Sequence, residues 1–139
     1  MTDPGTIGGI FAALYAAHQV ADHWVQTEQQ AATKGQPGWP GRVACLTHCA
    51  TYTATAFAAL AALYWATGTT GPAWRLGAGL AGSAVTHYIA DRRTPLRRIA
   101  DAVGRGGFYR VAGNGINGAY LLDQSWHVGW LFIAALVIA

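Results

Sequence analysis

Histidine and aspartate recur four residues apart within segments that are otherwise apolar, a pattern that a simple membrane anchor does not require. Residues four apart lie on the same face of an α-helix, which turns by about 100° per residue. Each such pair therefore presents one imidazole and one carboxylate from a single helix face. The three pairs are His18 with Asp22, His87 with Asp91 and, in reverse order, Asp123 with His127.

The segments around these pairs indicate a membrane protein. Of the 139 residues, 53% are hydrophobic and only 11% are charged, which lies outside the usual range of soluble domains. A helix of about 20 residues crosses a hydrocarbon core of about 30 Å. We therefore expect an all-α, polytopic membrane protein whose single domain, residues 1–139, is an antiparallel bundle of four transmembrane helices. The expected helices cover about residues 6–26, 42–67, 73–91 and 119–139.

The positively charged residues predict how these helices are oriented. The loop after the third predicted helix holds six arginines and the first loop, residues 27–41, holds Lys34, whereas the opposite side offers only Arg75. Positive flanks are retained in the cytoplasm, so we expect a multi-pass protein of the cytoplasmic membrane with both termini outside. A short interfacial helix is expected over residues 95–103. Topology accounts for the net charge of +3, so no nucleic-acid partner is expected.

This orientation places every unusual polar residue in the cytoplasmic half of the membrane. Intramembrane charges cost about 2.5–3.5 kcal/mol each on insertion scales and usually face a bundle interior, where they find partners. Imidazole nitrogens and carboxylate oxygens suit a divalent metal, zinc first, with manganese or iron as alternatives. More than four candidates leave room for two ions. The predicted ligands are His18, Asp22, His48, His87, Asp91, Asp123 and His127.

The remaining polar residues of the predicted helices are not expected to bind the metal directly. Gln26, Tyr52 and Gln124 are expected to orient the ligands by hydrogen bonding. His23 is turned away from the His18 stripe and is expected at the interface. Two cysteines, Cys45 and Cys49, are expected only to pack.

The third predicted helix carries unusually small side chains. Its small residues have the spacing that lets helix backbones approach closely within a membrane. We expect Gly79 and Gly82 to lie against another helix, and this glycine-rich face could also join two copies in a homo-oligomer.

The leading functional hypothesis is a metal-dependent hydrolase embedded in the lipid bilayer near the cytoplasmic leaflet. A bound ion would activate water for attack on a phosphoester or acyl centre, with Asp22 or Asp123 as general base. The sequence has no serine-nucleophile elbow and no H-E-x-x-H pattern. Four arginines beside the predicted third helix would hold an anionic small substrate or a phospholipid headgroup: Arg92, Arg93, Arg97 and Arg98.

Three other interpretations remain open at the level of sequence. Histidine and aspartate in spans also mark ion or proton pathways, here requiring an oligomeric channel or transporter because the outer helix halves are apolar. Two facing histidines could hold haem in an electron-transfer protein, although the carboxylates make this less attractive. The polar pairs could also serve only to join helices.

The motifs resemble those of small bacterial membrane proteins grouped as domain of unknown function 3307. The family pattern is H-x-x-x-D-x-x-x-Q, a lone H, H-x-x-x-D and D-Q-x-x-H in four successive spans. This chain matches each of them with His18, Asp22 and Gln26, then His48, then His87 and Asp91, then Asp123, Gln124 and His127. The resemblance implies a four-span protein of the bacterial inner membrane and names no reaction.

Overall fold

A computed structural model describes residues 3–139 and shows an all-α protein, which confirms the all-α part of the predicted fold class. The α-helices are α1 (Pro4–Val20), α2 (Glu28–Thr33), α3 (Gly38–Thr67), α4 (Ala73–Asp91), α5 (Thr94–Ala102), α6 (Gly106–Tyr109) and α7 (Gly118–Ile138). A π-helical turn, η1 (Ala21–Val25), continues α1, and a minimal antiparallel hairpin pairs β1 (Ala112–Gly113) with β2 (Ile116–Asn117).

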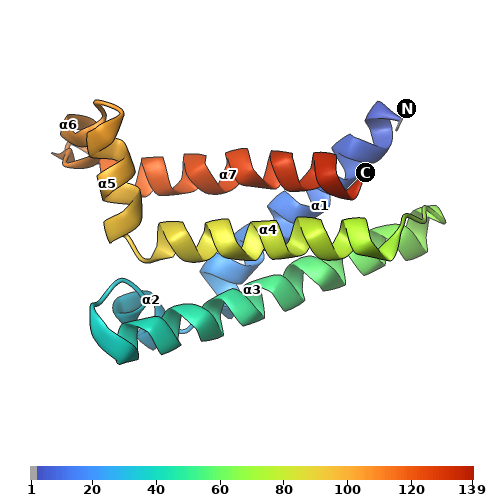
Figure 1. Ribbon diagram of the computed structural model, residues 1–139, viewed down its shortest axis with the longest axis horizontal. Helices are drawn as coiled ribbons and strands as arrows, with labels where there is room; N and C mark the ends of the chain where they lie inside the picture. Colours follow the sequence, from blue (N-terminus) through green and yellow to red (C-terminus); the bar gives the residue numbers. More distant parts are fainter. Residues whose placement is uncertain (1–2) are drawn as a thin grey trace.

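Four long helices form a bundle in which each packs on two neighbours. Helix α1 contacts α3 and α7, and α4 contacts the same two helices from the other side. Figure 1 shows α2, α5 and α6 at one end of the bundle and both chain termini at the other. The predicted antiparallel path of the four helices therefore holds.

Local sequence signals explain where the first helices begin and end. The Asp3 side chain accepts a hydrogen bond from the Thr6 amide, and Pro4 occupies the first turn, where its missing N–H costs nothing. Thr27 and Gln30 form a reciprocal capping box that starts α2. Gly68 ends α3 in the left-handed conformation, with φ of 68°.

The structure differs from the sequence expectation in the connections. The segment 27–41, expected as a loop, contains α2, and α3 begins at Gly38 rather than Arg42 because Pro40 falls in the first helical turn, where a proline is tolerated. The expected interfacial helix 95–103 is α5, shifted by one residue. The glycine-rich stretch after it contains α6 and the hairpin.

The two glycines of α4 behave differently. A Cβ atom at Gly79 would overlap the Ile138 side chain, so this glycine lets α4 approach α7 closely. The same atom at Gly82 would meet nothing within 4 Å. The prediction that Gly82 lies against another helix is wrong for the described residues 3–139, because α4 is rotated so that this position faces outward.

Apolar packing fills the bundle on the side of the chain termini. The largest members of this core are Ile10, Leu14, Tyr52, Leu60, Leu131 and Ile138. Within residues 3–139, two helices are long and apolar enough to cross a membrane, α3 and α7. Helix α1 has 17 residues before the π-helical turn, and α4 is 19 residues long.

Candidate metal centre

Four side chains from three helical segments bring one ligand atom each to a common point. Nε2 of His48 on α3 lies 2.9 Å from Nε2 of His87 on α4. Oδ1 of Asp22, on η1, lies 3.4 Å from the His48 nitrogen and 3.6 Å from the His87 nitrogen. Oδ2 of Asp91, at the end of α4, lies 3.3 Å from the His48 nitrogen and 3.2 Å from the His87 nitrogen. We call these four atoms the central cluster.

Each nitrogen of the central cluster lies at a distance from the other three ligand atoms that suits a shared metal ion. Zinc binds imidazole nitrogen and carboxylate oxygen at about 2.0–2.2 Å, so atoms around a tetrahedral zinc ion are about 3.4 Å apart. The five distances above, from 2.9 to 3.6 Å, bracket that value. Two imidazoles and two carboxylates are a donor set that suits a divalent ion.

The oxygen atoms of the central cluster lack the hydrogen bonds that buried carboxylates normally accept. Within the described chain, Oδ1 of Asp22 and Oδ2 of Asp91 are buried and accept none. Unpaired buried charge is costly, and such groups are usually paired or coordinate a metal. A cation held between these oxygens and the two imidazoles could satisfy them.

Lys34 is the one ammonium group that reaches this region in residues 3–139. Its Nζ lies 2.7 Å from Oδ1 of Asp91, leaving Oδ2 for the central cluster, and both side chains are buried. It comes from the turn after α2, which is positioned by Arg92: the guanidinium donates to the carbonyl oxygens of Lys34 and Gln36. Sequence reasoning read Lys34 only as a topology signal and missed this contact.

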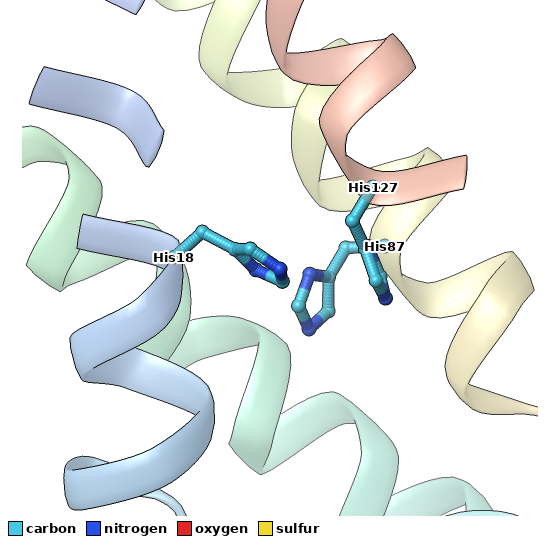
Figure 2. A group of neighbouring side chains, drawn as sticks. All are labelled: His18, His87 and His127. Carbon is cyan, nitrogen blue, oxygen red and sulfur yellow. The ribbon is translucent and has the colours of Figure 1, made fainter. Parts of the chain in front are cut away.

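A second group of buried nitrogens lies beside the central cluster. His18, His87 and His127 come from α1, α4 and α7, and one nitrogen of each lies within 4.8 Å of the others. Figure 2 shows the three rings converging, with a nitrogen edge of His87 directed towards the ring of His18. Nδ1 of His18 is 3.6 Å from Oδ2 of Asp22, and Nε2 of His127 is 3.6 Å from Oδ2 of Asp123. All seven predicted ligands therefore meet in one region.

Three polar residues were expected to orient the ligands, and their contacts differ. Tyr52 stacks on the His87 ring at 3.9 Å between centroids, and its hydroxyl forms a 2.6 Å hydrogen bond with Ser83. Gln124 donates to Oδ2 of Asp123. The Gln26 amide nitrogen is buried and makes no hydrogen bond within the described residues.

A cavity of about 450 Å³ gives access to this region from the end of the bundle that carries α2 and α5. Asp22, Asp91 and Asp123 lie in its wall, together with Lys34 and Arg93. Tyr109, Asn117 and Tyr120 add polar groups from the segment around the hairpin. Three of the predicted ligands, Asp22, Asp91 and Asp123, are therefore accessible to a small molecule through this cavity.

The four arginines expected to bind an anionic substrate separate into different environments. Arg93 lines the cavity and also donates to the carbonyl oxygen of Ala31. Arg92 is engaged by the two carbonyl groups described above, and Arg97 and Arg98 are exposed on α5. The role assigned to these arginines stays a prediction, with Arg93 the best placed of them.

Two free, buried cysteines also approach the site. The Sγ atoms of Cys45 and Cys49 and a carboxylate oxygen of Asp91 lie within 4.8 Å of one another. Together with His48 they repeat at three- and four-residue spacing, so a sequence pattern could have placed them on the ligand face of α3. His23 is exposed, and its Nδ1 lies 2.9 Å from the Gln19 carbonyl oxygen, away from the central cluster.

No protein-family model, curated protein or solved structure matches this chain. The resemblance to domain of unknown function 3307 stays a prediction. The site is therefore interpreted from its own geometry.

Proposed function

We propose that this protein is a membrane-embedded, metal-dependent hydrolase that takes an anionic substrate from the cytoplasmic side. The observation that supports the proposal is the central cluster, in which two imidazole nitrogens meet two carboxylates that line a cavity together with Lys34 and Arg93. Zinc is the preferred ion for this ligand set, with manganese or iron as alternatives.

Exposed apolar side chains support four membrane-crossing helices. Phe57 on α3, Val85 on α4 and Phe132 on α7 are all about half exposed at mid-helix positions. Exposed tryptophans mark both ends of the bundle, as at membrane interfaces: Trp24 and Trp39 at the end with α2, and Trp65 and Trp74 at the end with the termini. In this arrangement η1 extends α1 to the length a span requires.

The basic residues support the orientation. Helix α5, which carries Arg97 and Arg98, and helix α6, which is flanked by Arg105 and Arg110, lie at the end of the bundle opposite both termini (Figure 1). Positive flanks are retained in the cytoplasm. The cavity then opens to the cytoplasmic leaflet, where phospholipid headgroups and soluble anions are both available.

The chain supplies the groups that a hydrolytic step needs. A bound divalent ion lowers the pKa of a coordinated water and so provides hydroxide at neutral pH. Of the two carboxylates predicted as general base, Asp22 contributes to the central cluster, whereas Asp123 is half-buried beside the cavity and is free to accept a proton from the attacking water. Lys34 and Arg93 would attract a phosphoester or a carboxylate-bearing acyl substrate.

An ion or proton pathway is less well supported. The core between the central cluster and the termini is formed by residues such as Leu14, Leu60 and Leu131, which offer no polar groups. A hydrolase needs access from one side only.

The test is hydrolysis by the purified protein in detergent, loaded with zinc or manganese, against a phosphomonoester and an acyl ester that release a chromophore. We expect metal-dependent turnover that a chelator abolishes. Asp123→Asn should lower kcat by about 10²–10⁴-fold, the usual contribution of a general base, while the bound metal is retained. Asp101→Asn, on the exposed surface of α5, is the control. Absence of turnover with both substrates in the metal-loaded protein would refute the proposal.

A further inference from the structure

The two buried histidines outside the central cluster each have a carboxylate oxygen 3.6 Å away, beyond hydrogen-bond distance. Both ring nitrogens of His18 and Nε2 of His127 are buried without a hydrogen bond in the described chain. His18 is completely inaccessible, and the His127 side chain is 3% exposed. Helix packing alone would be better served by apolar side chains or by paired polar groups.

Asp22 connects these histidines to the central cluster. Its Oδ1 lies 3.4 Å from Nε2 of His48, and its Oδ2 lies 3.6 Å from Nδ1 of His18. One carboxylate thus directs one oxygen to each nitrogen group. Such an arrangement is what a carboxylate shared by two metal ions requires.

We propose that a second divalent ion binds beside the first. It would be held by His18 and His127, whose nitrogens lie within 4.8 Å of each other, and by the second oxygen of Asp22, which is 3.6 Å from Nδ1 of His18. Three protein ligands leave a position open for water or substrate, as in catalytic metal sites. Asp123, 3.6 Å from His127, borders that open position and stays available as the base. This inference rests on the proposed function and deepens it, because paired ions stabilise both the attacking and the leaving oxygen of a displacement.

A second ion also selects the class of substrate. With neutral imidazoles, one dication and Lys34 balance the charges of Asp22, Asp91 and Asp123, and Arg93 adds one positive charge at the cavity wall. A second dication raises the excess to three positive charges in a low-dielectric site, where uncompensated charge is costly. A phosphate dianion entering through the cavity would neutralise two of them, whereas an uncharged acyl ester would neutralise none. The two-ion site therefore favours phosphomonoesters.

The experiment counts metal ions in the full-length protein in detergent. The protein is stripped with a chelator and titrated with Mn²⁺, with elemental analysis and electron paramagnetic resonance as readouts. We expect two ions per chain with magnetically coupled spectra. His127→Ala should retain one ion and lose the magnetic coupling. If His127→Ala does not fold, His18→Asn tests the same site and should also retain one uncoupled ion. His23→Ala, which lies outside both sites, should keep two.

Inorganic phosphate provides the second readout. Phosphate should lower the Kd for the second Mn²⁺ at least about fivefold, the lower end of typical coupling between two ligands. The Kd for the first Mn²⁺ should stay unchanged. One ion per chain at saturation, or two ions in both the His18 and the His127 variants, would overturn the second site while leaving the proposed hydrolase standing. No bound ion would refute both. Two bound ions without any hydrolysis would support the second site and refute the hydrolase. A Mn²⁺ affinity that does not change with phosphate would overturn the proposed substrate class.

Discussion

Replacing Asp22 with asparagine should change the stability of the protein in opposite directions with and without bound metal. The substitution keeps the shape of the side chain and removes its charge. In the metal-free protein, Oδ1 of Asp22 is a buried carboxylate oxygen that accepts no hydrogen bond within residues 3–139. In the metal-bound protein, the same oxygen is one of the four atoms of the central cluster.

The magnitudes follow from these two environments. A buried acceptor left without a hydrogen bond costs about 1–3 kcal/mol, so Asp22→Asn should stabilise the metal-free protein by up to about that amount. A structural zinc ion contributes about 10–16 kcal/mol through four ligands, or about 2.5–4 kcal/mol per ligand. Since about 1.4 kcal/mol is a factor of ten, the variant should bind zinc roughly 10²–10³-fold more weakly. The asparagine oxygen, a weaker ligand, favours the lower value.

The assay is thermal unfolding in detergent, measured once with a chelator and once with saturating zinc. The variant should unfold above the wild-type protein in the chelator and below it in zinc. Asp101→Asn is a matched control, because Asp101 pairs with Arg110 at 2.6 Å on the surface and should respond equally in both conditions. A shift of the same sign and size for Asp22→Asn in both buffers would show that this carboxylate only joins helices and would remove the basis for a metal centre.

Three further predictions test packing, topology and metal linkage. Gly79→Val should lower the free energy of unfolding by about 1–3 kcal/mol, because the valine side chain would overlap Ile138. Gly82→Val should leave the thermal unfolding midpoint of the monomer unchanged. Equal effects at both positions would contradict the observed rotation of α4. A cysteine introduced at Gly107, where added atoms meet nothing within 4 Å, should react with a membrane-impermeant thiol reagent only from the cytoplasmic side. Labelling of this cysteine in intact cells would show that the loop faces outward and that the predicted orientation is wrong. Metal content, measured by elemental analysis after equilibration, should fall as pH is lowered because protons compete for the imidazole and carboxylate ligands; content that is constant down to the pH of unfolding would argue against these ligands.

Much of the local structure could be read from the sequence because its signals are local. Gly71 and Pro72 precede the helix expected over residues 73–91, and α4 has those bounds. The four-residue spacing of His87 and Asp91 put both side chains on one face of that helix, and their ligand atoms lie 3.2 Å apart. The same reasoning worked for His18 and Asp22 even though the chain passes into the π-helical turn between them.

The sequence by itself determined which residues share a helix face, because the helical repeat is fixed by backbone geometry. It did not determine how each helix is rotated and shifted against its neighbours, since that depends on how side chains of different helices pack. Only the tertiary structure decided that Gly79 faces α7 while Gly82 faces outward. It also decided that Lys34 returns to Asp91, and that one oxygen of Asp22 meets His48 while the other meets His18. These contacts join residues far apart in the chain, and only the packed bundle brings them together.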